Sequence, residues 1–217
     1  MAGGRLSAFA ASYAALVDVV EGLGEDAAWT PTGCLGWSVR DLVFHLHADA
    51  TRGLVALHTP ADLPADCDAV DYWRAWGSDS SSDEQNRRFT RLEAGLFGWP
   101  ELRSRYLESA RAVARGIAEA DPSQVVATQG HALTLADLAS TLAVEATLHH
   151  LDLVDQLPAA GPSAAGLAEV RRVVEALLDR DLVGWSDERV SLVGTGRGEP
   201  TSAELEDLGS AVVPVFT

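Results

Sequence analysis

The sequence of 217 residues is poor in cysteine and contains no long apolar run. Its two cysteines, Cys34 and Cys67, lie far apart and form no CxxC pair, which excludes a disulfide framework and indicates a reducing compartment. No stretch approaches the roughly 18 uninterrupted apolar residues of a membrane span, and the segment Met1 to Ser7 is unlike a signal peptide. We therefore expect a soluble, cytoplasmic protein without a membrane partner.

Basic residues are also scarce, because 32 acidic residues stand against 16 basic ones and give a net charge of −16. A surface this acidic repels phosphate backbones, so we expect no nucleic-acid partner. The basic residues lie scattered along the chain and form no block that would bind anionic lipid. With 47% apolar and 22% charged residues, the composition is still that of a globular protein with a sizeable core.

The sequence has helical periodicity in abundance. Apolar residues recur every three or four positions and predict helices over 6–23, 39–58, 84–96, 102–117, 135–157 and 167–178, with a short helical turn at 72–76 and a solvated loop over 77–83. Capping boxes are predicted at two of the helix starts, where Ser38 pairs with Asp41 and Thr134 pairs with Asp137. Pro100 occupies a favoured first-turn position.

The C-terminal tail has a different pattern. Segments 189–194 and 211–216 are typical of short strands, placed around the glycine-flanked turn at 195–198. The whole pattern predicts a mainly α protein, an antiparallel helical bundle with a small mixed α/β C-terminal appendage. We place the bundle in residues 1–158, and a C-terminal helix with short strands packed on it in residues 159–217.

One spacing in the sequence suggests metal chemistry. Glu145 and His149 are four residues apart on a predicted helix, so both side chains lie on one face and can bind one metal ion. His45, in the middle of another helix, could supply a third ligand and complete the set of an open zinc site. The spacing leaves an alternative open, because such pairs occur by chance and a mid-helix histidine is more often a hydrogen-bonded core residue.

The neighbours of these residues have two possible roles each. Asp152 could accept the free ring N–H of His149, or it could instead cap a surface turn or pair with an arginine, and these two interpretations are even. Trp37 either packs as an anchor at its helix start or lines a substrate pocket. His47 and His150 point away from the side that faces the metal, because each is displaced around its helix.

Three segments resemble the DinB-like superfamily. The segment GWSVRDLVFHL (36–46) is similar to its W-(S/T)-V-R-D-L signature with a following H-L pair. The segment VEATLHHLDL (144–153) resembles the E-x-x-x-H-x-x-D-L helix of the mycothiol-dependent maleylpyruvate isomerase and mycothiol S-transferase branch. The segment WSDERVSLVGTGR (185–197) is similar to the C-terminal part of many actinobacterial members.

The resemblance implies a DinB-like four-helix bundle that binds a divalent metal through His45, Glu145 and His149. Zinc is the expected ion, with nickel or iron as alternatives, and mycothiol is the expected co-substrate. The implied activity is that of a thiol-dependent transferase or isomerase acting on a small electrophile. A metal-dependent hydrolase using the same open site, or a non-catalytic DinB-like binding or stress protein, are the alternatives.

The resemblance also points to the tail. Arg197 is the candidate for a cationic substrate-binding or catalytic group, because the resembled isomerases use an arginine from the C-terminal region. Its flanking glycines are equally compatible with a plain tight turn. The tail is shorter than the C-terminal domain of the full isomerases, so the substrate stays open, and a homodimer is a further expectation from the family.

Overall fold

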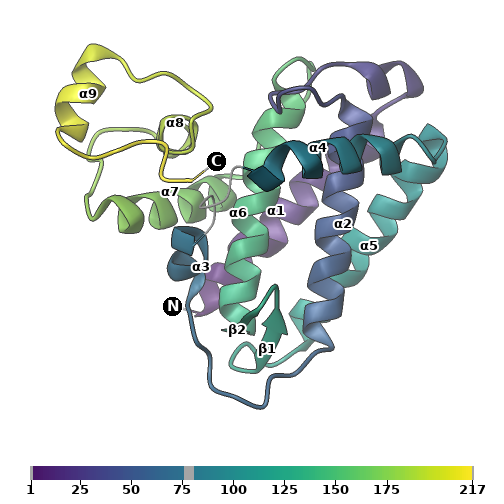
Figure 1. Ribbon diagram of the computed structural model, residues 1–217, viewed down its shortest axis with the longest axis horizontal. Helices are drawn as coiled ribbons and strands as arrows, with labels where there is room; N and C mark the ends of the chain where they lie inside the picture. Colours follow the sequence, from purple (N-terminus) through teal and green to yellow (C-terminus); the bar gives the residue numbers. More distant parts are fainter. Residues whose placement is uncertain (1, 76–80, 217) are drawn as a thin grey trace.

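The computed structural model of the chain describes residues 2–75 and 81–216. Its helices and strands, in chain order, are α1 (Ala2–Gly22), the 3-10 helix η1 (Glu25–Trp29), α2 (Val39–Leu57), α3 (Ala69–Ala75), α4 (Ser81–Ala94), α5 (Trp99–Glu119), β1 (Val125–Thr128), β2 (His131–Thr134), α6 (Leu135–Val154), α7 (Ala164–Leu178), α8 (Asp187–Gly194) and α9 (Ser202–Leu208). The long helices α1, α2, α5 and α6 form a four-helix bundle (Figure 1), which confirms the mainly helical fold predicted from the sequence. Of the loop predicted over 77–83, residues 77–80 lie outside the described residues, as does Trp76, and the rest belongs to α4.

The four bundle helices run in mixed directions. The Arg103 guanidinium, near the start of α5, donates to the Leu23 carbonyl just beyond the end of α1 at 2.7 Å, so these two helices are antiparallel. α2 and α5 run parallel, because their C-terminal ends meet where Leu57 lies against Gly116. The predicted antiparallel arrangement therefore holds for some neighbours, such as α1 with α5 and α2 with α6, and not for all (Figure 1).

The predicted capping box is confirmed at α2, whereas at α6 the structure shows the Thr134 N-cap without the return hydrogen bond from the Thr134 backbone N–H to Asp137. The Ser38 backbone N–H and hydroxyl both donate to Asp41 Oδ2, at 2.9 and 2.7 Å. The Thr134 hydroxyl accepts the Asp137 backbone N–H at 3.1 Å. Each cap satisfies N–H groups that the first helical turn leaves without an intrahelical partner. α2 and α6 carry the histidines of the predicted metal site, so the caps stabilise the two helices that position it.

The two strands predicted in the tail are wrong. Residues 187–194 form α8, and residues 211–216 form neither helix nor strand. The reason is visible at Ser186, whose hydroxyl accepts the Arg189 N–H at 3.1 Å and starts a helix that the short valine and leucine pattern does not reveal. The strands lie instead in the antiparallel hairpin β1–β2, which turns at two positive-φ residues, Gln129 and Gly130.

Helix α6 lies between two hydrophobic cores and is buried on nearly all sides. One face packs with α1, α2 and α5 in the core of the bundle. The opposite face contributes Val144 and Leu148 to a second core, shared with α3, α7 and α8. A helix that is apolar all round belongs inside a protein, so polar residues on α6 face buried or partly buried surroundings.

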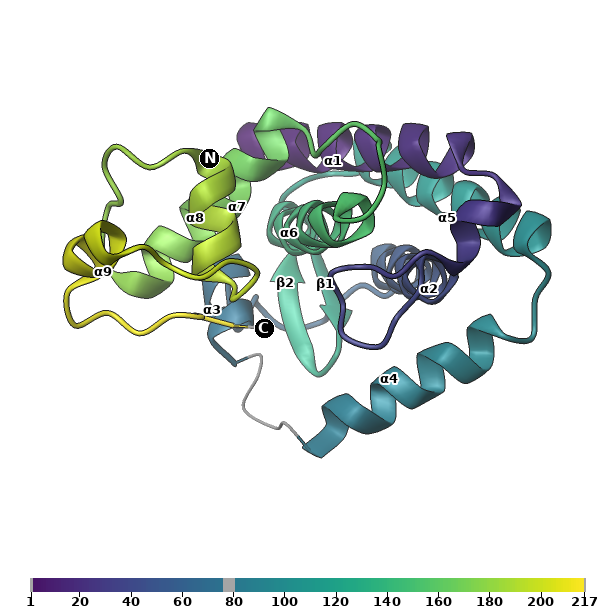
Figure 2. The same cartoon turned by 90° about the horizontal axis from the view of Figure 1, so that it is seen from above.

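Helices α7, α8 and α9 form an appendage on one side of the bundle, away from α4 (Figure 2). α7 contacts α1 and α6, and α8 packs on α7 so closely that a Cβ at Gly194 would lie 2.5 Å from the Val174 side chain. This packing carries segment 195–198 to the C-terminal half of α6. In the described part of the chain, no helix combines the length and the apolar character needed to span a bilayer.

Candidate metal centre

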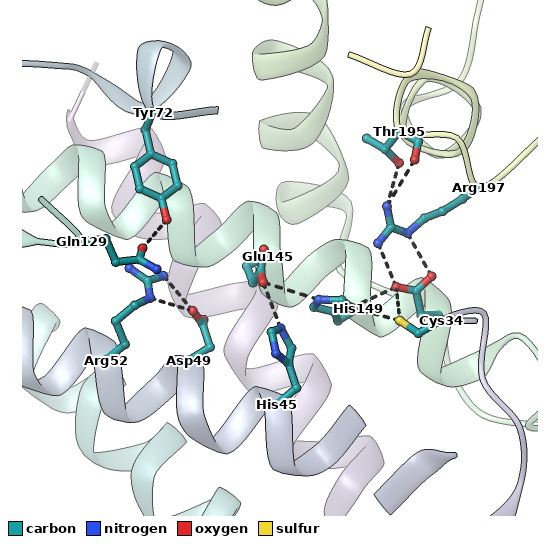
Figure 3. Close-up of polar contacts among 11 residues, drawn as sticks. Cys34, His45, Asp49, Arg52, Tyr72, Gln129, Glu145, His149, Thr195 and Arg197 are labelled. Atoms are coloured by element: carbon teal, nitrogen blue, oxygen red, sulfur yellow. Dashed lines mark hydrogen bonds and ion pairs between the residues drawn. The ribbon is translucent and has the colours of Figure 1, made fainter. Parts of the chain in front are cut away.

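The structure brings His45, Glu145 and His149 together between α2 and α6 (Figure 3). Glu145 Oε1 lies 3.0 Å from His45 Nε2 and 3.4 Å from His149 Nε2. The two imidazole rings are 4.6 Å apart between centroids and nearly perpendicular. One carboxylate oxygen therefore faces two ring nitrogens, and all three ligand atoms lie within 4.8 Å of one another.

The electrostatics of this cluster favour positive charge at its centre. Burial alone would raise the pKa of the Glu145 carboxyl, but hydrogen bonds with His149 and His45 hold that pKa well below its usual value. Burial alone would lower the pKa of His149, but its hydrogen bonds with Asp152 and Glu145 raise it well above the usual value. An anionic carboxylate between two imidazoles is a donor set that suits a divalent cation of the zinc type.

Asp152 contacts both His149 and an arginine, two of the contacts that the sequence left open. Its Oδ2 accepts from His149 Nδ1 at 2.9 Å. The same carboxylate accepts from Arg197 at both oxygens, with Nε at 2.9 Å from Oδ1 and Nη2 at 2.8 Å from Oδ2. Burial alone would raise the pKa of Asp152, but His149 and Arg197 lower it far below its usual value. A bidentate guanidinium thus anchors the carboxylate that orients the histidine.

The loop before α2 packs directly on Asp152. The Gly33 backbone N–H donates to the Asp152 carbonyl at 2.9 Å, and a Cβ at Gly33 would lie only 2.9 Å from Asp152 Oδ1. The next residue, Cys34, places its Sγ 3.2 Å from Asp152 Oδ2 and 3.6 Å from His149 Nδ1. Cys34 was not predicted for the site, because it precedes the signature helix and only the fold brings its loop to α6.

The cluster opens into a cavity of about 370 Å³. Its wall is built from the loop before α2, from α2, α3 and α4, from α6, and from the C-terminal segment. The lining residues include Cys34, Trp37, His45, Trp73, Asn86, Arg87, Thr90, Glu145, Leu148, His149, Asp152, Arg197 and Phe216. A volume of this order is typical of small-molecule sites. Every residue predicted for the site therefore borders a single cavity.

Trp37 serves both as an anchor and as part of the wall. Its ring lies 5.2 Å from the His45 ring and 6.4 Å from the His149 ring, measured between centroids. Its indole N–H donates to the Arg87 carbonyl at 3.4 Å, which joins the start of α2 to α4. The contribution of α4 was not predicted, because the sequence shows its helical periodicity but not which face borders the cavity.

His47 and His150 are turned away from the cluster, as expected from their positions on the helices. His47 Nδ1 lies 2.9 Å from the Ser109 hydroxyl on α5. His150 Nε2 donates to the Ala160 carbonyl at 3.0 Å. Burial lowers the pKa of both imidazoles.

Comparison with known proteins identifies the family of the chain. A family model described as the mycothiol maleylpyruvate isomerase N-terminal domain matches residues 9–154, which include the whole bundle core and all three residues of the cluster. The match spans well over half of the chain, so the chain belongs to this family. A search of curated proteins finds no match. A search of solved structures also finds none.

Proposed function

From this family membership, we propose that the chain is a metal- and thiol-dependent transferase or isomerase that acts on a small electrophile. The observation that supports it most is that the His45–Glu145–His149 cluster faces a cavity instead of being sealed in the core. A structural zinc site is closed by four protein ligands, whereas a catalytic site keeps a position open for substrate. Three protein ligands beside a cavity match the second kind.

The three residues would hold a divalent metal, with zinc the expected ion and nickel or iron as alternatives. When bound there, the metal would lower the pKa of a thiol so that it is present as the nucleophilic thiolate at neutral pH. The thiol comes from outside the chain, and mycothiol is the co-substrate that the family suggests. The chain belongs to a reducing compartment such as the cytoplasm, where both of its cysteines stay free.

The protein's own contribution is to hold the histidines in one orientation. Asp152 accepts the Nδ1–H of His149 and so leaves Nε2 directed at Glu145. The bidentate contact from Arg197 fixes Asp152 in turn. Outer contacts of this kind fix the tautomer and raise the basicity of a ligating imidazole, so Arg197 acts on the cluster as a positioning residue.

The cavity wall defines the class of substrate. Arg87 from α4 and Arg197 from the tail both border the cavity, and the guanidinium of Arg197 is already paired with Asp152. Arg87 is therefore the group we assign to a carboxylate of the electrophile. The aromatic rings of Trp37 and Phe216 form apolar parts of the same wall. A small electrophile with one carboxylate and an apolar or unsaturated body suits this lining.

The test is a thiol-dependence assay on zinc-loaded protein with a chlorodinitrobenzene as the electrophile. We expect consumption of the electrophile only when mycothiol is added, and loss of that activity in His149→Ala. His47→Ala is the matched control, because His47 lies on the same helix as His45 and contacts Ser109 instead of the cluster. Turnover of ester or amide substrates by water without any thiol would instead identify a metal-dependent hydrolase, and no turnover of either kind would favour a binding protein.

A further inference from the structure

A second group of metal-ligand side chains lies outside the cavity, at the hairpin end of the bundle. Asp66 and Cys67 belong to the connection between α2 and α3, which passes beside the hairpin β1–β2 in Figure 1. His131 is the first residue of β2. Among the described residues, these three form one of only three groups whose ligand atoms lie within 4.8 Å of one another, and the other two groups both contain His149.

The backbone holds Asp66 in register with the hairpin. The Asp66 N–H donates to the Ala132 carbonyl at 2.9 Å, and Asp66 Oδ1 accepts the Ala132 N–H at 3.1 Å. The connection is also tied to β1, where the Ala61 N–H donates to the Val125 carbonyl at 3.0 Å. The carboxylate and the imidazole of His131 are thus presented by paired backbone, not by a free loop.

The distances suit tetrahedral coordination. Asp66 Oδ1 lies 3.6 Å from His131 Nδ1. With Zn–O and Zn–N bonds of about 2.0–2.1 Å, two ligands of a tetrahedral zinc ion are separated by roughly 3.3–3.4 Å. Small side-chain rotations would close the remaining gap, because the side chains of His131 and Asp66 are 37% and 53% exposed and free to adjust.

The donor chemistry distinguishes zinc from harder cations. A thiol, an imidazole and a carboxylate together suit zinc, whereas calcium and magnesium prefer oxygen ligands alone. The surroundings are acidic, since Asp68 and Asp71 both lie near enough to Cys67 to act on its thiol electrostatically. A negative field of this kind raises the local concentration of cations.

We propose that Asp66, Cys67 and His131 bind a second zinc ion, independent of the one proposed in the cavity, with water at the fourth position. The Cys67 thiol gives up its proton to solvent as the thiolate binds. The ion joins the α2–α3 connection to the hairpin and so fixes α3, whose Trp73 forms part of the cavity wall. The site stabilises the position of that wall and takes no part in the chemistry.

The test uses cobalt as a spectroscopic substitute for zinc, because a thiolate ligand produces a charge-transfer band that histidine and carboxylate do not. We expect two equivalents of cobalt per chain, and a band that is lost in Cys67→Ser and retained in Cys34→Ser. Cys34→Ser is the matched control, since Cys34 is the other free cysteine and borders the cavity. A band that is lost in Cys34→Ser and retained in Cys67→Ser, or the absence of any band, would overturn the proposal.

A second measurement removes the cavity site from the experiment. In the His149→Ala variant, zinc should still raise the melting temperature, and adding His131→Ala should weaken binding of the remaining equivalent by about 100-fold or more, as expected for loss of a ligand. Both variants are compared without metal by circular dichroism to establish that they fold. If zinc binds His149→Ala and the double variant equally well, the ion lies elsewhere and the proposal fails.

Discussion

The two clusters of metal-ligand side chains are held in opposite ways. In the cavity cluster, His45, Glu145 and His149 extend from two packed helices, and their side chains are only 13–28% exposed. In the cluster at the hairpin, Asp66 and His131 are 53% and 37% exposed. The first lies between two hydrophobic cores, and the second lies at the surface on a connection and a strand edge.

The two clusters differ in the residues around the candidate ligands. His149 is oriented by Asp152, and Asp152 is held by Arg197. His131 has no comparable carboxylate partner outside its cluster among the described residues, since its one ion-pair distance there is to Asp66 and its other neighbour is the Tyr72 ring. Burial and the neighbouring Asp66 carboxylate also raise the pKa of the Cys67 thiol to about 12, so metal binding there must first displace a proton. We expect the cavity cluster to bind more tightly.

The largest effect should come from the same carboxylate-to-amide change made in each cluster. Glu145→Gln removes the charge at the centre of the cavity cluster. It should weaken zinc binding there by roughly 100- to 1,000-fold, the loss of affinity expected when a zinc ion loses one of its ligands. Asp66→Asn should weaken the hairpin site by only about tenfold, because solvent already screens that carboxylate. Competition with a chromophoric chelator measures both constants, and equal losses would remove the contrast between the sites.

Asp152→Asn tests whether the contacts of Asp152 with His149 and Arg197 explain the tighter zinc binding expected in the cavity cluster. The amide is isosteric but carries no charge, so it pairs poorly with Arg197 and no longer stabilises the imidazole. Loss of such a partner should weaken zinc binding by about 10- to 100-fold. Asp155→Asn is the matched control, because Asp155 is exposed at the end of α6 and its one side-chain hydrogen bond within the described residues is from the neighbouring Gln156. An unchanged affinity in Asp152→Asn would show that burial alone holds the cavity cluster.

Arg197→Lys tests how much the bidentate geometry of the Arg197 contact, apart from its charge, contributes to zinc affinity. A lysine keeps the positive charge but cannot contact both oxygens of Asp152 at once. We expect zinc affinity to fall about three- to tenfold, somewhat less than the loss for Asp152 itself. Arg111→Lys is the control, since Arg111 forms an exposed pair with Glu21 far from the cavity. A loss of turnover with unchanged zinc affinity would place Arg197 on the substrate instead.

The smallest effect concerns the pH dependence of stability in chelator-treated protein. The folded-state pKa of Asp152 is lowered despite burial, by its contacts with His149 and Arg197, so its charge stabilises the fold above the unfolded-state pKa of about 3.9. That stabilisation is lost as pH falls through the lowered value. In urea unfolding, the free energies of unfolding of wild type and Asp152→Asn should therefore converge as the pH falls below about 4. Exposed Asp66 should give a smaller, salt-sensitive difference, and a pH-independent gap for Asp152→Asn would contradict this account.

The sequence was most informative where local rules decide the structure. The helix starts at Ser38 and Thr134 could be predicted, because each of these residues can form a hydrogen bond with the residue three positions later. The candidate ligands followed from a four-residue spacing together with a family resemblance. α8 was missed because an eight-residue helix with valine and leucine has little periodicity to distinguish it from a strand.

The contacts that complete the site could not be read from the sequence. Cys34 reaches Asp152 only because Gly33 allows the loop to approach within van der Waals contact. Arg197 reaches it only because α8 packs tightly on α7. Both contacts join residues far apart in the chain. Because they depend on tertiary packing, no local sequence pattern predicts them.

The most direct test of the cavity metal is anomalous diffraction at the zinc edge from crystals of the zinc-loaded protein. We expect an anomalous peak bonded to His45 Nε2, Glu145 and His149 Nε2. Among the described residues the competing arrangement is Cys34, Asp152 and the other nitrogen of the same histidine. A peak on that side of His149, or no peak beside the cavity in protein that is fully loaded, would contradict the central claim.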